Sequence, residues 1–518
     1  MCFAPQELFP EREPQRLFFN GDETGSRWFR IPFLLSASDG TLIAGTDANF
    51  GSTGDSAENI DAAIRRRSPE GVWEAPFLPP ALHLRDYADE PGYRQKSASF
   101  IDGMILQDTQ GVGTPGRLHL MIDGWAWNGG LFQQMYPTVV RKVAPGDGFA
   151  RIGDRKYLLL TSRPQHTEDG LNGNTDLSRF DYAADLWGSR DERGQIPVYC
   201  LESSGQGVSL GARTEYSLTD AMELCRNGDL LYLPQKGESS AGEMVPMNPL
   251  YEDSVLQMYN TSYFYHMVSD DLGRSWRLEQ IASGLCKRTG TGAYLTGPGR
   301  GVQLECGPYR GRMLFPTYYF QEDRLRSEVI FSDDGGKTWA HSATVPSGGS
   351  ISESALVELP DGSVGKFMRN AGNSGGKMVW SVSHDGGMNW SRPQSVLGDN
   401  EAGVNCQLSA LRYSRELPSR EGGRYPALLL ASPFSSKRTN GRLLIGLIKP
   451  DGHCSGGVKY RIDWEYQIQV TAQDTLFAYS CLTELPDGRI GLLYETSPTD
   501  SWQDGLQAMI YEEFALSL

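Results

Sequence analysis

The chain has 518 residues, including 60 glycines and 29 prolines, and its formal net charge is −16 at pH 7. A charge this negative argues against a nucleic-acid partner or an anionic membrane surface, because both would repel it. No stretch of about 18 apolar residues occurs, so no membrane span is expected. Frequent glycine and proline are typical of many short strands joined by tight turns.

The N-terminal sequence "MCFAPQELFPEREPQ" lacks the basic and apolar regions of a secretory signal. As written, the protein is expected in the cytoplasm, or outside the cell if a leader has been removed. The eight cysteines are scattered without a C-x-x-C pair, and the seven histidines show no metal-ligand spacing. Free buried thiols and no structural zinc are expected.

The first unit of the chain, from Arg30, is expected to form a meander of four strands. Its first turn lies in "LLSASDGTLIAG", and Asp-Gly between two apolar runs is a strong hairpin signal. A second strand ends at Asp47, the loop "ANFGSTGDSAEN" follows, and the strand "IDAAIRR" leads into "SPEGVW".

The second unit starts near Asp102 with the strands "IDGMILQ" and "RLHLMID", but its next strand, "FYHMVS", comes only after a long interval. A structureless loop of roughly 140 residues is improbable. The interval also contains strand-like pieces such as "KYLLL" and "MELCRNGDLLYL". We therefore expect residues 124–262 to form an inserted β-rich subdomain, and residues 1–123 and 263–518 to form the main domain.

One eight-residue phrase then occurs three times, as "SDDLGRSW" from Ser269, "SDDGGKTW" from Ser332 and "SHDGGMNW" from Ser383. Asp and Ser side chains can bond backbone amides, Gly supplies a positive φ, and Trp can anchor the next strand. The phrase is therefore expected to be a structural turn.

Four further units complete the pattern, starting near Gln303, at Glu353, near Gln407 and at Tyr479. The last unit runs out of chain after three strands, so the N-terminal segment "QRLFFN" is expected to supply its fourth. Six four-stranded sheets closed by the two chain ends predict an all-β fold, a six-bladed β-propeller with a β-rich inserted subdomain.

The turns sort the residues of these units onto two faces. Alternate turns of a meander fall at opposite ends of the sheet, so both turn types described above share one end of each blade. Strand starts, and loops between second and third strands, share the other end. The residues eight or nine positions before an Asp-Gly turn, or eight after one, are Arg30, Glu353, Tyr479, Asp47, Arg369 and Glu495.

This second face is expected to gather positive charge. Arg30 and Arg369 lie there, with Arg438 from the loop "FSSKRTNG". Three guanidinium groups in one funnel are costly unless an anion binds, and they match a carboxylate bidentately. Taken singly, each arginine is explained as well by a surface ion pair, so the predicted anion site depends on their joint placement.

Several of these segments resemble one family. "FRIP" at 29–32, followed by the repeated turns, looks like the bacterial sialidases (neuraminidases), glycoside hydrolases with a six-bladed propeller. "SESALVEL" and "FMRN" are similar to the family's catalytic-glutamate strand and second arginine, and "AYSCLTELPDGRIGLLYE" to its tyrosine strand. The resemblance covers nearly the whole chain.

The resemblance implies a role for each candidate residue. Arg30, Arg369 and Arg438 would hold the sialic-acid carboxylate, and Tyr479 would be the nucleophile with Glu353 as its base. Sialic acid carries a carboxylate on its anomeric carbon, so a neutral phenol avoids the repulsion that a carboxylate nucleophile would meet. The other implied residues are Asp55 as acid/base, Glu495 beside the first arginine, and Asp102 at the sugar's hydroxyl or N-acyl side.

The sequence also departs from the family pattern. It reads "DANF" after the second strand, so Asn49 stands where an arginine often contacts the sugar's 4-hydroxyl. One extra residue before the "NID" strand makes Asp61 a rival to Asp55 as the acid. Arg442 is the alternative to Arg438.

The loop "GWAWNGGLF" either packs in the core or against the insertion, or projects its indoles over the site. In the second case, Trp125, Trp127 or Phe132 is the hypothesis for the N-acyl pocket. The insertion, and the loop with Trp502, resemble the branch that includes intramolecular trans-sialidases. In those enzymes a glycerol hydroxyl of the substrate replaces water and yields a 2,7-anhydro product. The motif also occurs in hydrolytic relatives, so hydrolysis is expected.

Two functions of different classes remain. The first is an exo-sialidase that releases terminal α-linked sialic acids from glycoconjugates with retention, the intramolecular reaction being its alternative. The second is a non-catalytic carbohydrate-binding propeller, which would keep the turns but lose Tyr479 and Glu353. Both residues are present, which favours the enzyme. Sialylated glycans are the expected partners, and neither a cofactor nor a metal is implied.

Overall fold

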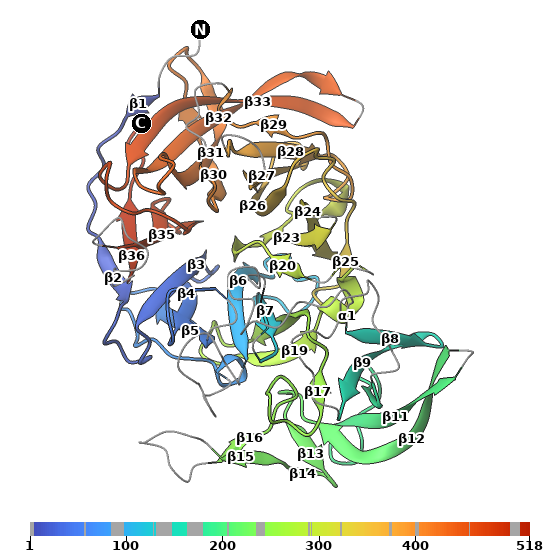
Figure 1. Cartoon of the computed structure of the whole chain (residues 1–518). Coiled ribbons are helices and arrows are strands. Elements are labelled where there is room, and N and C mark those ends of the chain that lie inside the picture. Colours follow the sequence, from blue (N-terminus) through green and yellow to red (C-terminus); the bar gives the residue numbers. More distant parts are fainter. Residues whose placement is uncertain are drawn as a thin grey trace.

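β-Strands dominate the structure, as the sequence predicts (Figure 1). The computed structural model describes residues 5–55, 59–83, 98–127, 129–130, 148–162, 180–204, 207–234, 244–288, 291, 293–321, 324–371, 376–398, 404–454, 456–497 and 508–518. Across these ranges, a single short α-helix, α1 (Ser283–Cys286), interrupts the strands. The strands form a six-bladed propeller with additional sheets.

The first two blades are joined edge to edge. Their strands are β3 (Trp28–Ser36), β4 (Leu42–Asn49), β5 (Ile60–Arg67), β6 (Ser99–Gln107), β7 (Leu118–Trp125), β18 (Ser262–Ser269) and β19 (Arg277–Ile281). β5 and β6 pair in parallel at Ile60 and Ser99, which makes one sheet of the two blades. The fourth strand expected in the first blade is reduced to isolated bridges, one of them between Ile64 and Phe77.

The third and fourth blades are separate sheets. The third contains β20 (Tyr294–Thr296), β22 (Val302–Gln303), β23 (Met313–Gln321), β24 (Arg324–Ser332) and β25 (Ala340–His341). The fourth contains β26 (Ile351–Glu358), β27 (Val364–Asn370), β28 (Val379–Ser383) and β29 (Gln394–Ser395). The inner strand of the third blade is split, because β21 (Gly299–Arg300) leaves β23 and pairs with β6 instead.

The chain ends close the ring. The fifth blade contains β30 (Ser409–Pro418), β31 (Arg424–Pro433), β32 (Gly441–Cys454) and β33 (Gly457–Gln469), with β1 (Gln6–Glu7) at its edge. The sixth contains β34 (Ser480–Glu484), β35 (Ile490–Thr496) and β36 (Ala508–Phe514). β2 (Gln15–Phe18) pairs with β36 and supplies the missing fourth strand, as expected, with Leu17 and Phe18 buried.

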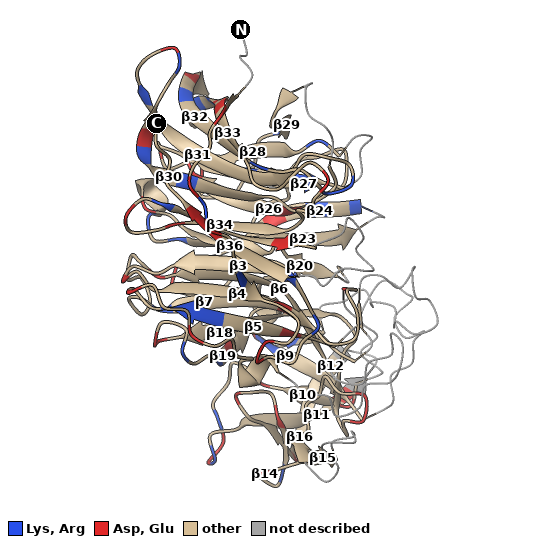
Figure 2. Cartoon of the chain, turned by 90° about the vertical axis from the view of Figure 1, so that its left-hand side faces the viewer, with Lys and Arg blue, Asp and Glu red and all other residues tan. Residues whose placement is uncertain are grey.

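The chain between β7 and β18 builds sheets outside the ring, at the lower end of the molecule in Figure 2. One contains β8 (Phe149–Ile152), β9 (Arg155–Thr161), β10 (Tyr182–Ala184), β11 (Ile196–Ser204), β12 (Gly207–Leu218), β13 (Leu224–Arg226), β14 (Asp229–Leu230) and β17 (Gln257–Met258). The other is a ribbon of β15 (Tyr232–Pro234) and β16 (Met244–Pro246). Leu158 of β9 and Tyr263 of β18 belong to one apolar cluster, so the insertion packs on the second blade. Its assignment as a subdomain spanning 124–262 stays a prediction.

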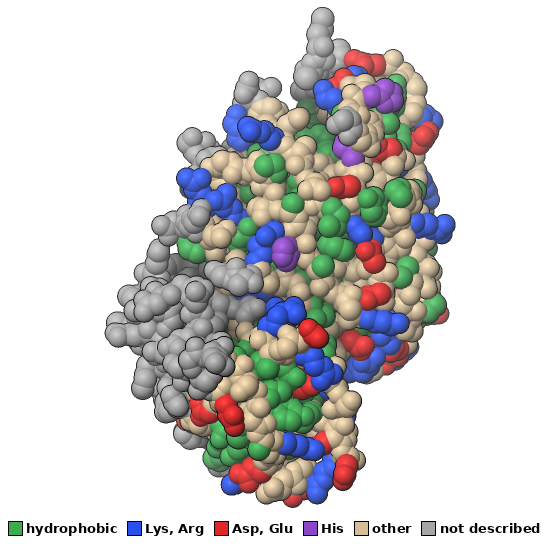
Figure 3. Space-filling model, turned by 90° about the vertical axis from the view of Figure 1, so that its right-hand side faces the viewer, with side chains coloured by type: hydrophobic (Ala, Val, Ile, Leu, Met, Phe, Trp, Pro, Cys, Tyr) green, Lys and Arg blue, Asp and Glu red, His purple; other side chains and the backbone are tan. Residues whose placement is uncertain are grey.

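Charges of both signs are interspersed over the face shown in Figure 3. Among the helices that the structure describes, none has the length and apolar character needed to cross a membrane.

The repeated phrase forms the expected turn at the blade end away from the candidate site. At Ser332 the hydroxyl donates to Asp334 (2.8 Å) and accepts the amide of Gly336 (2.8 Å), whose φ is 84°. The carboxylate of Asp334 also accepts the amide and the hydroxyl of Thr338, at 2.9 and 2.6 Å, and Trp339 is 3% exposed. The same bonds recur at Ser269, Asp271, Gly273 and Ser275, and at Ser383, Asp385, Gly387 and Asn389.

Replacing the turn carboxylate is expected to cost stability. We predict that Asp334→Ala lowers the free energy of unfolding by about 1–2 kcal/mol, because three hydrogen-bond donors lose their acceptor. Burial alone raises the pKa of Asp334, but its hydrogen bonds hold that pKa below the usual value. The lost stability is therefore fully expressed above about pH 4 and shrinks as the pH falls further.

Urea unfolding of wild type and variant at several pH values measures this effect. Asp474→Ala is the matched control, since Asp474 is exposed and no side-chain bond is recorded for it in the described chain. Equal midpoints for all three proteins at pH 7 would contradict a stabilising role for the turn.

Candidate active site

Six of the candidate side chains meet at one mouth of the ring. They are Arg30 on β3, Glu353 on β26, Arg369 on β27, Arg438 in the turn between β31 and β32, Tyr479 just before β34, and Glu495 on β35. Each inner strand starts at this mouth and runs away from it, which is why residues far apart in sequence converge here.

Register slips in three strands set the positions of Arg30, Asp102 and Glu353. The ladders slip between Arg30 and Phe33 on β3, between Ile101 and Met104 on β6, and between Ile351 and Ser354 on β26. Such bulges re-aim side chains and are common beside active sites. The slips contain Ile31 and Asp102, at φ 58° and 66°, and Glu353. A β-branched residue at positive φ is a true outlier, so the surrounding structure must hold it there.

The hydroxyl of Tyr479 lies between a carboxylate and a guanidinium group. It donates to Oε1 of Glu353 at 2.7 Å and accepts a bond from Nη1 of Arg369 at 3.0 Å. The same Nη1 donates to Oε2 of Glu353 at 2.7 Å, so the three groups form a closed triangle. Burial, and then the charge of Glu353, raise the pKa of Tyr479 well above its usual value, while Arg369 and Arg438 oppose that rise. In the free protein the phenol is therefore neutral.

Arg30 is held by carboxylates on two sides. Its Nε donates to Oε1 of Glu495 at 2.8 Å, and its Nη1 forms an ion pair with Asp55 and donates to the carbonyl of Thr53. Its guanidinium carbon lies 5.8 Å from the centre of the Tyr479 ring. Glu495 is fully buried, and burial raises its pKa although Arg30 opposes the shift.

Arg438, rather than Arg442, faces the site. Its guanidinium carbon lies 5.8 Å from the centre of the Tyr479 ring, and its Nε and Nη2 donate to the carbonyl of Asn405 at 3.1 and 2.8 Å. Arg442 instead donates to Gln467. Of the two alternatives, the geometry favours Arg438.

Asp102 lies in a cluster of buried acids at the base of the site. Its amide points at the carboxylate of Asp47 (3.3 Å), and its pKa is raised well above normal by burial and then by Asp47 and Asp123. Burial likewise raises the pKa values of Asp47 and Asp123. A buried acid favours its neutral form, and a neutral carboxyl group can donate a hydrogen bond to a ligand oxygen.

The Asp55 loop is tied to the blade through Asn49. The Asn49 amide nitrogen donates to the carbonyl of Gly54 at 2.7 Å, so this residue supports the loop from below. Asp61, the rival acid, is 1% exposed and its carboxylate pairs with His83. Asp55, with 28% of its side chain exposed and in contact with Arg30, is better placed to meet a ligand.

Both indoles of the loop "GWAWNGGLF" are buried in the structure. Trp125 is 1% exposed, in an apolar cluster that also contains Ile101, Tyr318 and Tyr479, and Trp127 is 6% exposed. This burial agrees with a packing role for both indoles but does not remove either from the site, since Tyr479 is also only 6% exposed. A role in an N-acyl pocket stays a prediction. Phe132 and Trp502 lie outside the described residues.

Two residues at the site were not expected from the sequence. Asn405 contacts both Arg369 and Arg438, although it sits in an ordinary segment, "AGVNCQL", with no motif to mark it. Tyr318 of β23 is 6% exposed, and its pKa is raised well above normal by burial and then by Glu353 and Asp102. An aromatic strand, "MLFPTYYFQ", gives no sign of which tyrosine faces the centre.

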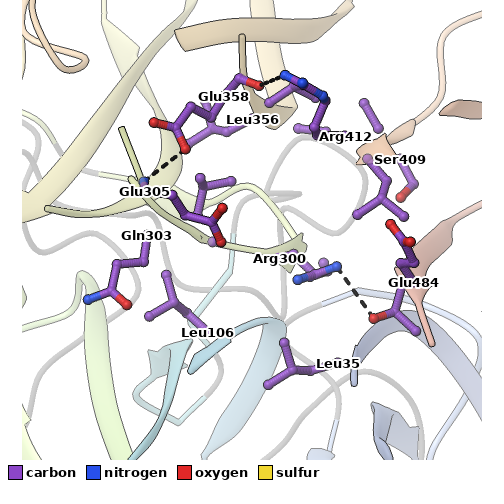
Figure 4. A pocket seen from close by; sticks show the side chains of 18 of the residues that line it. Leu35, Leu106, Arg300, Gln303, Glu305, Leu356, Glu358, Ser409, Arg412 and Glu484 are labelled. Atoms are coloured by element: carbon purple, nitrogen blue, oxygen red, sulfur yellow. Dashed lines mark hydrogen bonds between the residues drawn. The ribbon is translucent and has the colours of Figure 1, made fainter. Parts of the chain in front are cut away.

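A cavity of about 500 Å³ opens at the opposite mouth of the ring (Figure 4). Inner-strand ends line it, among them Ser36, Glu358 and Glu484, each a few residues before an Asp-Gly turn. Glu358 accepts the amides of Glu305 and Cys306, each at 2.9 Å. The cavity contains none of the six convergent side chains and is therefore separate from the candidate site.

Comparison with known proteins shows which family the chain resembles over nearly its whole length. The structure of an intramolecular trans-sialidase from Ruminococcus gnavus in complex with oseltamivir carboxylate superimposes with a TM-score of 0.78. The two are 30% identical, and the match covers 96% of this chain and 97% of that one. The chain belongs to the sialidase family. Its residues 250–411 also match the BNR repeat-like domain family.

Other sialidases match over most of the chain. The anhydrosialidase of the leech Macrobdella decora is 32% identical over 507 residues, which cover 94% of this chain and 60% of the leech protein. Sialidase B of Streptococcus pneumoniae serotype 4 is 28% identical and is covered to 64%. The chain thus spans less than two thirds of these curated sialidases. A leech intramolecular trans-sialidase complexed with 2,7-anhydro-Neu5Ac has a TM-score of 0.78 at 29% identity, covering 98% of this chain and 70% of that one.

Proposed function

We propose that the protein cleaves terminal α-linked sialic acids from glycans through a covalent bond to Tyr479. The observation that carries the proposal is the triangle of Tyr479, Glu353 and Arg369, in which the phenol already donates to its base at 2.7 Å. A nucleophile bonded to a base that a third group orients is the arrangement expected of covalent catalysis. A non-catalytic propeller would have no need of this triangle.

The ligand carboxylate would bind the three arginines. Arg30, Arg369 and Arg438 come from three different blades, and the last two each lie against the ring or hydroxyl of Tyr479. In the free protein the carboxylate of Asp55 forms an ion pair with the guanidinium group of Arg30. An arriving carboxylate would compete for that guanidinium and release Asp55 toward the glycosidic oxygen.

The reaction would proceed by two displacements at the anomeric carbon. In the first, the Tyr479 hydroxyl gives its proton to Glu353 and its oxygen bonds to the anomeric carbon as the glycosidic bond breaks. The leaving oxygen takes a proton from Asp55, which gains that proton from water once it has left Arg30. In the second, a hydroxyl group attacks the same carbon and gives its proton to Asp55, the bond between that carbon and the Tyr479 oxygen breaks, and the phenol recovers its proton from Glu353. Two inversions give overall retention.

The attacking hydroxyl of the second step decides the product. Hydrolysis is the expectation from the sequence, but two of the relatives above are described as intramolecular trans-sialidases and one as an anhydrosialidase. These similarities favour the alternative, in which a hydroxyl of the bound sugar's own glycerol chain attacks and a 2,7-anhydro sugar is released.

Proton NMR of a reaction with 3′-sialyllactose tests whether the protein cleaves sialosides and which product it releases. We expect time-dependent release of lactose together with the 2,7-anhydro sugar. Release of free sialic acid as the first product, in the α form, would keep the sialidase activity but contradict the intramolecular route. No release from wild type would overturn the proposed function and favour the binding propeller.

The assignment of the third arginine gives a matched pair of variants. We expect Arg438→Lys to lower kcat/KM for a fluorogenic sialoside by about 30-fold or more, since a planar guanidinium contact is lost. Arg442→Lys, on the same blade but bonded to Gln467, should stay within about threefold of wild type. Equal losses in the two variants would contradict the placement of Arg438 at the ligand.

A further inference from the structure

We propose that Asn405 is a positioning residue that aligns two arginines from different blades with a neutral acceptor, which adds no negative charge beside the ligand carboxylate. The inference rests on the proposed function, because it concerns the same site. Asn405 lies on the segment that leads into β30, between the fourth and fifth blades.

The side chain of Asn405 fixes the orientation of Arg369. Its Oδ1 accepts Nε of Arg369 at 2.6 Å, opposite the Nη1 that contacts Glu353 and Tyr479. These bonds occupy Nε and Nη1. The structure records no bond from Nη2 of Arg369 within the described residues. The remaining nitrogen is therefore the one presented to a ligand.

The backbone of Asn405 fixes Arg438 in the same way. Its carbonyl accepts Nε and Nη2 of Arg438, at 3.1 and 2.8 Å. Arg438 itself sits at φ 59°, so its direction depends on a backbone conformation that few side chains favour and that the carbonyl helps to hold. One residue thus sets the geometry of two guanidinium groups.

The segment that carries Asn405 is well anchored. Its neighbours Val404 and Cys406 are 2% and 1% exposed, whereas Asn405 is exposed at the mouth. At Gly376, φ is 59°, and an added Cβ would lie 3.1 Å from the Val404 carbonyl carbon and 3.2 Å from the Asn405 nitrogen. A tightly packed backbone with one exposed side chain is suited to holding an acceptor at a fixed point.

The neutral charge of the amide is the second part of the inference. Arg30 already contacts Asp55 and Glu495, and Arg369 contacts Glu353. A carboxylate at position 405 would accept the same bond from Arg369 but add another negative charge beside the ligand carboxylate. Like charges repel, so the added carboxylate would oppose binding of the ligand carboxylate.

Three variants separate positioning, charge and simple misfolding. Asn405→Asp keeps the acceptor and adds charge, Asn405→Ala removes the acceptor, and Asn227→Asp adds the same charge on an exposed turn of the insertion. Affinities for free N-acetylneuraminic acid and for its primary carboxamide are measured by calorimetry, with thermal midpoints to confirm folding. KM and kcat for 3′-sialyllactose are measured in parallel.

We expect Asn405→Asp to lower the affinity for N-acetylneuraminic acid at least about tenfold more than the affinity for the uncharged carboxamide, because only the acid is repelled by the new carboxylate. KM should rise by a similar factor while kcat changes by less than about threefold. Asn405→Ala should lower the affinity for N-acetylneuraminic acid by about three- to tenfold, as expected for one lost hydrogen bond to a charged group. Asn227→Asp should match wild type in every measurement.

Two results would overturn the inference while leaving the proposed function intact. If Asn405→Asp lowers the affinities for the acid and the carboxamide equally, the role of Asn405 is merely structural. If both variants at position 405 bind the two ligands like wild type, Asn405 has no role in positioning the arginines. Failure of wild type to bind the acid or to cleave 3′-sialyllactose would remove the proposed function and this inference together.

Discussion

The hydroxyl of Tyr479 is the point on which the site depends, because it must be neutral at rest and yet give up its proton on demand. Burial and the adjacent Glu353 keep the phenol protonated, while Arg369 and Arg438 stabilise the charge that develops when the proton leaves. Neither influence suffices alone. An isolated buried tyrosine would be inert, and a tyrosine among arginines without a base would have no acceptor for its proton.

The propeller supplies this balance by bringing separate blades to a common mouth. Glu353 and Arg369 come from the fourth blade and Tyr479 from the sixth, so their triangle exists only when the ring is closed. The sixth blade is completed by β2, which comes from the N-terminal part of the chain and pairs with β36. The turns at the opposite mouth fix the second, third and fourth blades with bonds that repeat almost unchanged in the three copies. Stability and chemistry are thus placed at opposite ends of the same strands.

The sequence predicted much of this arrangement for a physical reason. Asp-Gly turns fix where strands end, and a constant spacing of eight or nine residues therefore fixes which side chains share a face, as for Glu353, Arg369 and Tyr479. Other features follow from tertiary packing that no local pattern records. The register slips that re-aim Arg30 and Asp102, the excursion of β21 toward β6, and the contact of Asn405 with two arginines all depend on neighbouring blades. The sequence left open whether Trp125 and Trp127 pack in the core or face the site, because an aromatic run looks the same in a strand and in a loop.

The most direct test of the account is to trap the covalent bond that it requires. A fluorinated sialosyl fluoride reacts by the first displacement but is slow in the second, so the labelled protein can be digested and sequenced by mass spectrometry. The account predicts one sialosyl label on the peptide that contains Tyr479, absent from Tyr479→Phe. A label on another residue, or cleavage of sialosides that proceeds at the wild-type rate in Tyr479→Phe, would contradict it.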